Sequence, residues 1–326
     1  MKLIFGNKKK IAIHIEDDSI SILVGSATSI VASDNIKLPN GICEDGNIIR
    51  REVISNFIND YLEDNKIKAK EVSFVIGGTN VISRYIEVPI MKDEALRETL
   101  EYEFSEFIPQ IDDYYIDYEI VEKIVEEDKK AYKILLVACL KEQIDVLVDI
   151  SEDIDKELDV IDISSNCVAR VISRSSYSSS ENSVGVLYLG ENASTFSIIE
   201  NGNSKIERNL PFGVNNILGE GSNNKVHNIY DMLEKDDRLK MSFENLLSTM
   251  GNTLRYYNSD WKNKLVNKFI IICDSLDIEN LDKYMSEYFT IPCMKIESPS
   301  DLDLKIELDK NFSKYIPAYG LFLRRE

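Results

Sequence analysis

The stretch YIEVPIMKDEALRETLEYEFSEFIPQIDDYYIDYEI, residues 85–120, predicts a strand, a helix and a second strand in close succession. Asp93 is a favourable helix N-cap and Pro109 cannot continue a helix, so we expect the helix to lie between them. Apolar side chains recur there at spacings of three and four and form one apolar face: Leu96, Leu100, Phe104 and Phe107. Tyr114 to Ile120 then alternates as a half-buried strand does. The simplest interpretation of the apolar face is packing on the helix's own sheet.

Three motifs within this stretch resemble a known family. They are P-I-M at 89–91, E-x-E-F-x-x-F-I-P at 101–109 and I-D-x-x-x-I-D-Y at 111–118. Together they are similar to the inserted subdomain of the PilM family, the actin-like proteins of type IV pilus assembly. RNLPFG, at 208–213, resembles the family's Arg-x-Ile-Pro-Phe-Gly, and YIPAYGLFLRR, at 315–325, resembles its closing helix.

The resemblance implies an α/β, actin-like (ASKHA) two-lobed fold with an inserted α+β subdomain in lobe one. We expect lobe one at residues 1–180, with the inserted subdomain at about 89–158. The run RSSYSSSEN has the composition of a linker and marks the boundary between the lobes. Lobe two is then expected at 181–310, and residues 311–326 are expected to form a helix that returns to lobe one.

The composition argues against several classes of function. The formal net charge is −19, which opposes binding to nucleic acid phosphates and to anionic lipids. No apolar run approaches the roughly 20 residues of a membrane helix, and the N-terminal apolar patch is too short for a secretory signal. We therefore expect a cytoplasmic protein that does not insert into the membrane and that reaches its inner face through a protein partner.

The numbers and spacing of cysteine and histidine residues argue against disulfides, metal sites and a catalytic triad. The five cysteines never form a C-x-x-C pair, which indicates reduced, buried thiols rather than disulfides or zinc ligands. The only histidines, His14 and His227, are too few for a His-built metal centre or a catalytic triad. We expect neither a metal site nor catalytic residues.

The family resemblance implies three nucleotide loops, and the first of them is altered here. In the hairpin at residues 10–24, His14 stands where the family has an Asp that orients a water on Mg²⁺. Glu16 stands where the family has a Gly that lets the backbone approach phosphate. Asp17 or Asp18 could substitute for the missing metal-orienting group, but a solvated turn is the simpler interpretation.

The other two loops are altered as well. In the second hairpin a Tyr replaces the family's Asp, while a Gly and two hydroxyl residues remain; in the third loop CDSL, at 273–276, replaces a Gly-Gly pair that faces adenine. The candidate cofactor-binding residues here are Tyr188, Gly190, Ser194, Thr195, Asp274 and Ser275. The resemblance therefore implies ATP with Mg²⁺ only if the altered cleft still binds nucleotide, and it predicts little or no hydrolysis.

The resemblance also implies a partner, the short cytoplasmic N-terminal tail of a single-span membrane protein similar to PilN. We place its groove between lobe one and the inserted subdomain, against the predicted helix and the strand before it. The candidate partner-binding residues are Tyr85, Val88, Leu96, Leu100, Glu101, Phe104, Phe107 and Ile108. The expected anchors of the tail are Leu96, Leu100, Phe104, Phe107 and Ile108, and Glu101 is expected to face its basic segment.

Three functions are compatible with these observations. The first is a pilus-assembly scaffold that binds the PilN-like tail, with contact to the pilus motor ATPase and homo-oligomerisation left open. The second is an active actin-fold ATPase or sugar-kinase-like enzyme, which the lost Asp and Gly positions disfavour. The third is an FtsA-like, filament-forming division protein, which is expected to end in an amphipathic membrane helix unlike GLFLRRE.

Overall fold

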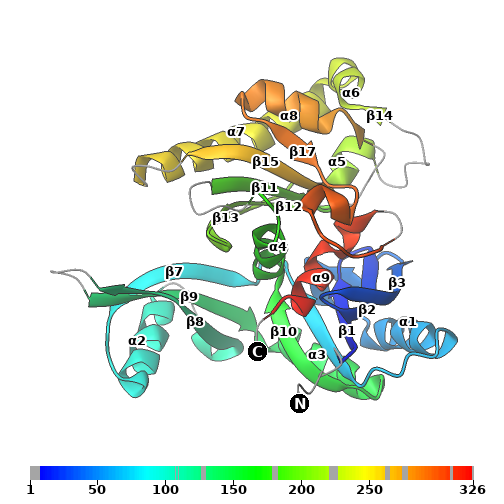
Figure 1. Ribbon diagram of the computed structural model, residues 1–326, viewed down its shortest axis with the longest axis vertical. Helices are drawn as coiled ribbons and strands as arrows, with labels where there is room; N and C mark the ends of the chain where they lie inside the picture. Colours follow the sequence, from blue (N-terminus) through cyan, green and yellow to red (C-terminus); the bar gives the residue numbers. More distant parts are fainter. Residues whose placement is uncertain are drawn as a thin grey trace, which may run out of the picture.

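The computed structural model describes residues 8–106, 108, 110–125, 130–177, 183–219, 227–260, 265–273, 278–308 and 311–324 of the chain. Two five-stranded sheets are stacked, with helices between and outside them (Figure 1). Each sheet has an antiparallel meander of three strands followed by two parallel strands, in the same spatial order. This repeated arrangement defines the two lobes.

Lobe one has the strand order β10-β6-β1-β2-β3. Its strands are β1 (Lys10–Ile15), β2 (Ser19–Ser26), β3 (Ser29–Lys37), β6 (Glu71–Ile76) and β10 (Glu157–Ile163). The helices α1 (Arg51–Asp64) and α3 (Lys141–Asp153) bury their apolar faces against one side of this sheet. A short hairpin of β4 (Cys43–Glu44) and β5 (Asn47–Ile48) precedes α1.

Lobe two has the strand order β13-β12-β11-β15-β17. Its strands are β11 (Ser183–Leu189), β12 (Ser194–Glu200), β13 (Asn203–Leu210), β15 (Val266–Cys273) and β17 (Cys293–Lys295). Four helices lie on its outer side: α5 (Val214–Leu218), α6 (Ile229–Lys235), α7 (Asp237–Asp260) and α8 (Leu281–Phe289). The short strands β14 (His227–Asn228) and β16 (Ile278–Glu279) pair with each other.

Two helices fill the space between the sheets. The helix α4 (Ser164–Ser173) lies against α9 (Ile316–Phe322), which follows the 3-10 turns Pro299–Leu302 and Phe312–Tyr315. Their core contains Ala12 and Val75 from lobe one together with Val186 and Ile270 from lobe two. The C-terminal helix therefore packs on β1, β2 and β6 of lobe one while closing the core that both lobes share.

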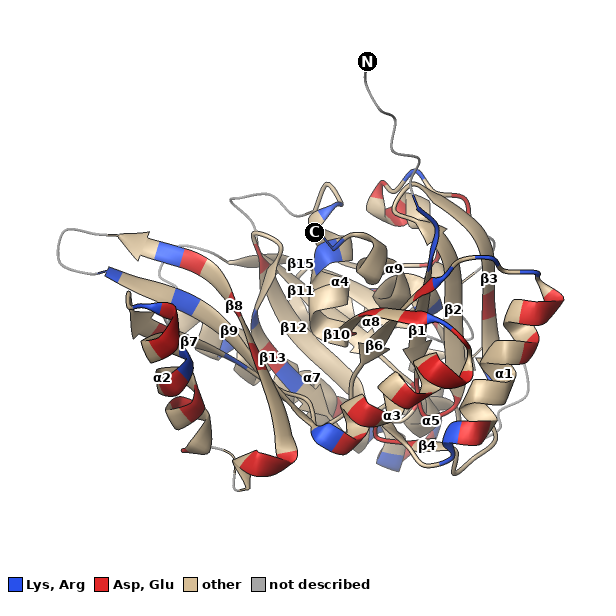
Figure 2. Cartoon of the chain, turned by 90° about the horizontal axis from the view of Figure 1, so that it is seen from below, with Lys and Arg blue, Asp and Glu red and all other residues tan. Residues whose placement is uncertain are grey.

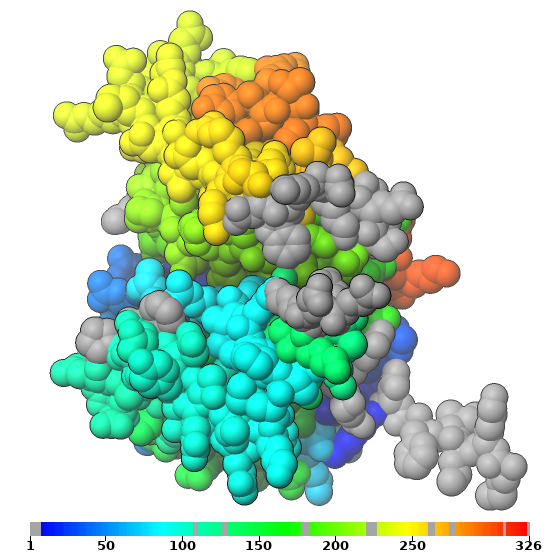
Figure 3. Space-filling view, turned by 90° about the vertical axis from the view of Figure 1, so that its left-hand side faces the viewer, coloured from blue at the N-terminus to red at the C-terminus, as the bar shows by residue number. Residues whose placement is uncertain are grey.

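The inserted subdomain projects from lobe one (Figures 1 and 3). Its sheet has the order β7-β9-β8, with β7 (Ile82–Pro89), β8 (Tyr114–Val125) and β9 (Lys130–Leu140). The helix α2 (Asp93–Ser105) covers one face of this sheet, and a 3-10 turn, Ile111–Asp113, leads into β8. The amphipathic pattern predicted this helix correctly, but its N-cap is Lys92 rather than Asp93, which lies in the first turn.

The boundaries of this subdomain differ from the estimate of about 89–158. Its sheet begins at β7, because Ile82 pairs with Ala138 of β9. After β9 the chain is back in lobe one, because α3 packs beside α1 in the lobe-one core. Hydrophobic periodicity locates helices and strands but does not show which core an apolar face joins, so the estimate begins and ends too late.

Candidate functional site

A small cleft separates the two first hairpins of the lobes. The β1–β2 turn, residues 16–18, faces the β11–β12 turn, residues 190–193, beside the end of β6. The cleft encloses about 130 Å³. The structure brings seven of the candidate cofactor-binding residues to it: His14, Glu16, Asp17, Tyr188, Gly190, Ser194 and Thr195. Asp274 and Ser275 lie outside the described residues.

Side chains from the two lobes meet inside this cleft. The hydroxyl of Tyr188 donates a hydrogen bond to Glu16 Oε1 at 2.9 Å. Lys37, at the end of β3, lies with Nζ 2.5 Å from Asp18 Oδ2 and 2.7 Å from Glu191 Oε1. Sequence reasoning missed Lys37 and Glu191 because their contact joins positions 154 residues apart, and no local pattern signals it.

Burial and mutual hydrogen bonds together set the protonation of this cluster. Burial, together with a hydrogen bond to Asp18, raises the pKa of Glu191 to about 7. Burial acts in the same upward direction on Asp18, but its hydrogen bonds to Glu191 and Lys37 outweigh burial and lower its pKa. The two carboxyl groups likewise outweigh burial at Lys37 and raise the pKa of its ammonium group. A protonated Glu191 beside an ionised Asp18 is therefore a substantial species near neutral pH.

His14 contributes a neutral ring to the same cleft. Its side chain is only 4% exposed, and burial lowers its pKa to about 4. Its Nδ1 lies 3.7 Å from Glu16 Oε2 and has no hydrogen-bond partner among the described residues. An uncharged imidazole lacks the negative charge with which an Asp at this position would attract a Mg²⁺-bound water.

The two hydroxyl residues of the second hairpin are engaged within lobe two. Ser194 donates its hydroxyl hydrogen to the carbonyl oxygen of Phe212, and Thr195 Oγ1 donates to Asn209 Oδ1 at 3.1 Å. Gly213, in the predicted PFG motif, lets the chain pass close to this turn, since a Cβ there would lie 2.3 Å from the Glu191 carbonyl oxygen. These contacts fix the second hairpin internally.

The residues of the cleft do not fit ATP with Mg²⁺. Small-molecule pockets generally enclose about 300–1,000 Å³, well above the volume of about 130 Å³ found here. Carboxyl side chains of Glu16, Asp17, Asp18, Asp45 and Glu191 line the cleft and repel phosphate oxygens. The side chain of Glu16 also occupies the space that a glycine at this position would leave open for a phosphate to approach the backbone.

The predicted partner anchors lie inside the core of the inserted subdomain. Leu96, Leu100, Phe104, Ile108 and Val88 are each at most 4% exposed, and they pack against β9. A peptide cannot contact these side chains without opening that core, so their assignment as partner-binding residues is corrected: they hold α2 on its sheet.

The remaining predicted partner residues have other positions. Tyr85 is half-buried on the opposite face of the inserted sheet, where the Lys133 ammonium lies 5.8 Å from its ring centroid. Burial, with smaller contributions from Glu207 and Glu119, raises the pKa of the Tyr85 hydroxyl. Glu101 is exposed on the outer side of α2, and Phe107 lies outside the described residues.

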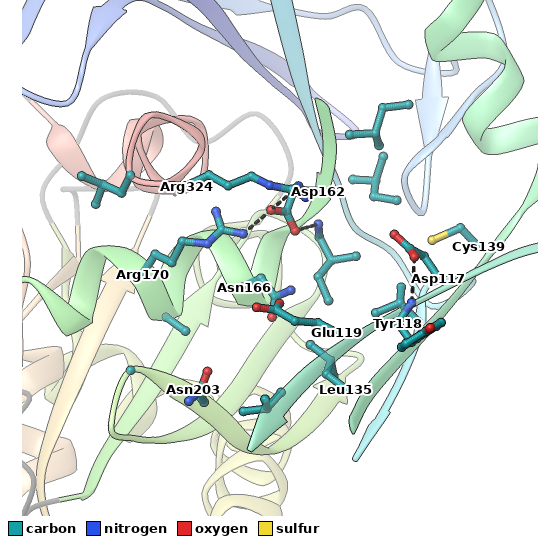
Figure 4. Close-up of a pocket in the computed structure, with 18 of the residues that line it drawn as sticks. Asp117, Tyr118, Glu119, Leu135, Cys139, Asp162, Asn166, Arg170, Asn203 and Arg324 are labelled. Carbon is teal, nitrogen blue, oxygen red and sulfur yellow. Dashed lines mark hydrogen bonds and ion pairs between the residues drawn. The ribbon is translucent and has the colours of Figure 1, made fainter. Parts of the chain in front are cut away.

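A larger groove lies on that opposite face, between the inserted subdomain and lobe one (Figure 4). It encloses about 1040 Å³. One wall is β8, with the consecutive residues 115–119 all in the lining; the other wall is formed by the end of β10 and by α4. Leu135 and Val137 of β9 and Ile161 of β10 supply apolar surface between the walls.

Charged groups from distant parts of the chain meet in this groove. On the lobe-one side, Arg170 pairs with Asp162, and Arg324 Nη1 lies 3.4 Å from Asp162 Oδ2 (Figure 4). On the β8 side, Asp117 and Glu119 project from the strand. Sequence reasoning missed these residues, because Arg170 fits the polar face of an amphipathic helix and no local pattern pairs it with Asp162 or brings Arg324 to them.

The outer surface is strongly acidic. Acidic residues are frequent along α2, α1 and α3 (Figure 2). Among the helices of the described residues, none is both long and apolar enough to cross a membrane.

The two lobes, the paired hairpins and the shared α4–α9 layer define an actin-like protein. Two solved structures support this class at moderate similarity. One is the ethanolamine utilization protein EutJ from Carboxydothermus hydrogenoformans, with a TM-score of 0.52 and 10% identity over 97% of this chain and 89% of that chain. The other is a protein of unknown function with an actin-like ATPase fold from Bacteroides thetaiotaomicron, with a TM-score of 0.52 and 8% identity over 100% of both chains.

Within this class, the family model of the type IV pilus assembly protein PilM matches residues 26–326. The chain therefore belongs to the PilM family. A structure of a PilM-PilN type IV pilus biogenesis complex is similar over 96% of this chain and 97% of that chain, with a TM-score of 0.80 and 12% identity. No curated protein sequence gives a significant match.

Proposed function

We propose that this protein is a cytoplasmic scaffold of type IV pilus assembly, and that it binds the N-terminal tail of a PilN-like membrane protein. The observation that carries this proposal is the groove of about 1040 Å³ between lobe one and the inserted subdomain. The similar structure of a PilM-PilN complex supports a partner of this kind. The tail would hold the protein at the inner face of the membrane.

The shape of the groove suits an extended peptide. The strand β8 is last in the order of the inserted sheet, and β10 is last in the order of the lobe-one sheet, so the groove runs between two sheet edges. A sheet edge offers backbone N–H and C=O groups to an added strand. A tail that pairs with β8 would direct alternate side chains toward the half-buried Val137 and the others toward solvent.

The charges of the groove suit a tail with a basic segment. Asp162 is already paired with Arg170 and Arg324, whereas Asp117 and Glu119 are exposed along β8. Basic residues between the tail and its membrane helix would meet these two carboxylates. Such pairs at a groove margin accelerate association more than they increase affinity.

Replacing Asn166 with Trp is expected to weaken tail binding by about tenfold or more. Asn166 lines the groove from α4 and is half-buried, so an indole there fills the space without entering the lobe core. The measurement is a fluorescence titration of a synthetic PilN-like N-terminal tail against the wild type and Asn166→Trp.

Two controls distinguish the groove from other surfaces. Asn56→Trp makes the same change on an exposed position of α1, and Glu101→Lys reverses a charge on the outer face of α2; both should bind as the wild type does. Equal binding by Asn166→Trp would place the tail outside this groove. Weakened binding by Glu101→Lys alone would instead favour the outer face of α2.

We also infer that the protein has no ATPase activity. His14 and Tyr188 replace the groups that would position Mg²⁺, and Tyr188 is already bonded to Glu16. We expect Mg²⁺-dependent ATP turnover of the wild type to equal that of a variant with both His14 and Tyr188 changed to Ala. A coupled phosphate-release assay measures this, and turnover in the wild type alone would support the active ATPase or kinase instead.

A further inference from the structure

The hairpin turns of the two lobes are bonded directly to each other across the cleft. Lys37 connects Asp18 of the β1–β2 turn with Glu191 of the β11–β12 turn, at 2.5 and 2.7 Å. A second contact, from Tyr188 Oη to Glu16 Oε1, lies beside it at 2.9 Å. In actin-like ATPases the equivalent turns hold the nucleotide phosphates between them.

Burial makes these contacts more than surface ion pairs. The carboxyl side chains of Asp18, Glu16 and Glu191 are each at most 24% exposed, although Lys37 itself is 63% exposed. Hydrogen bonds that include an ionised group are about twice as strong as neutral ones. In the closed state the buried carboxyl groups have lost much of their water, and the contacts with Lys37 and Tyr188 replace those hydrogen bonds. Removing these partners leaves the carboxyl groups unsatisfied while the turns are closed, which favours separation of the turns.

We propose that Lys37, Asp18 and Glu191, together with the Tyr188–Glu16 hydrogen bond, hold the two lobes closed in place of a bound nucleotide. The chain's own side chains occupy the region between the turns, which explains why the remaining cleft encloses only about 130 Å³. The lobe arrangement is then set without ATP. This inference does not depend on the binding of a partner tail.

The bridge is sensitive to pH through Glu191. The charged groups that face it are Asp18 and Lys37, with Glu16 and Asp17 in the same turn and Lys314 acting on Asp18 from the Phe312–Tyr315 turn. In the closed state the pKa of Glu191 is raised, so the closed state binds its proton more tightly than the open state does. The stabilisation from Glu191 is therefore present at acidic pH and is lost as the pH rises through about 7. The stabilisation from Asp18, whose pKa is lowered, is lost instead when the pH falls far enough to protonate it, so the bridge is most stable at mildly acidic pH.

The test is a distance between spin labels on the two lobes, measured by double electron–electron resonance. Glu52→Cys on α1 and Glu234→Cys on α6 replace exposed residues. These two helices lie on opposite lobes (Figure 1). Cys293→Ser removes the native cysteine that is not fully buried. At about pH 6 we expect one narrow distance in the otherwise wild-type protein.

Combining Lys37→Met with Tyr188→Phe should increase the mean distance between the labels by several ångströms and broaden its distribution. Raising the pH of the wild type to about 8.5 should produce a smaller change in the same direction. Glu191→Gln keeps a neutral, hydrogen-bonding side chain, so it should stay closed at both pH values. Lys68→Met, an exposed lysine outside the cleft, is the matched control and should not change the distance. Unchanged distances in the Lys37 and Tyr188 double variant would overturn the proposal, and so would pH-dependent opening of Glu191→Gln.

Discussion

Replacing Phe104 with Ala is expected to reduce the free energy of unfolding of the inserted subdomain by about 3–5 kcal/mol. Phe104 is 1% exposed and packs with Leu96 and Leu100 against β9, so its removal leaves a cavity in a small core. The core joins one helix to a three-stranded sheet, which leaves few other contacts to compensate. Urea unfolding with hydrogen exchange of β8 and β9 measures the loss.

The matched control for this variant is Tyr102→Ala, on the same helix. Tyr102 is 65% exposed, so its replacement should change stability by no more than about 0.5 kcal/mol. If Phe104→Ala unfolds at the same urea concentration as the wild type and retains its exchange protection, α2 is not held by this core. Tail binding should weaken with Phe104→Ala to the extent that the subdomain is unfolded, because the unfolded fraction lacks the β8 wall of the groove.

The helix α2 shows what the sequence could predict and where the prediction failed. Its periodicity correctly predicted a helix with Leu96, Leu100 and Phe104 on one apolar face. The same periodicity fits a face that meets a partner and a face that meets its own sheet. These side chains pack against the apolar surface of β9 inside the subdomain, so they are not available to anchor a partner.

The family resemblance predicted a groove between lobe one and the inserted subdomain, but local sequence pattern did not predict the residues that line it. Its walls come from β8, β10 and α4, and Arg324 joins it from the C-terminal end of the chain. Each element has an ordinary interpretation when considered alone. The sequence of β8 is typical of a half-buried strand, and Arg170 fits the polar face of an amphipathic helix. The concavity arises only when the inserted sheet is placed beside lobe one.

The cleft was predicted better because its parts belong to hairpins with recognisable positions. His14, Glu16 and Tyr188 were named as departures from nucleotide loops, and the structure places all three in one cavity. What these residues do instead was not predictable. The contacts of Glu16 with Tyr188 and of Lys37 with Glu191 cross between lobes, and charge alone does not indicate such a pairing.

Replacing Gly320 with Ala should destabilise the layer between the lobes. A Cβ at Gly320 would lie 2.3 Å from the carbonyl oxygen of Cys167, and the obstacle is backbone that cannot rotate away. Overpacking of this kind costs about 3 kcal/mol, and the better helix propensity of Ala offsets about 1 kcal/mol. The expected net loss in the free energy of unfolding is about 2 kcal/mol, measured by urea denaturation.

Gly251→Ala is the matched control, because Gly251 also lies in a helix but its added Cβ would meet no atom closer than 3.8 Å. This change should stabilise the protein by about 1 kcal/mol, opposite in sign to Gly320→Ala. Equal effects of the two would show that α4 and α9 are not in close contact. The carbonyl oxygen of Gly320 also accepts a hydrogen bond from Arg170 Nη1 at 3.0 Å. A shift of α9 therefore weakens the anchoring of Arg170, and Gly320→Ala should reduce tail binding while Gly251→Ala leaves it unchanged.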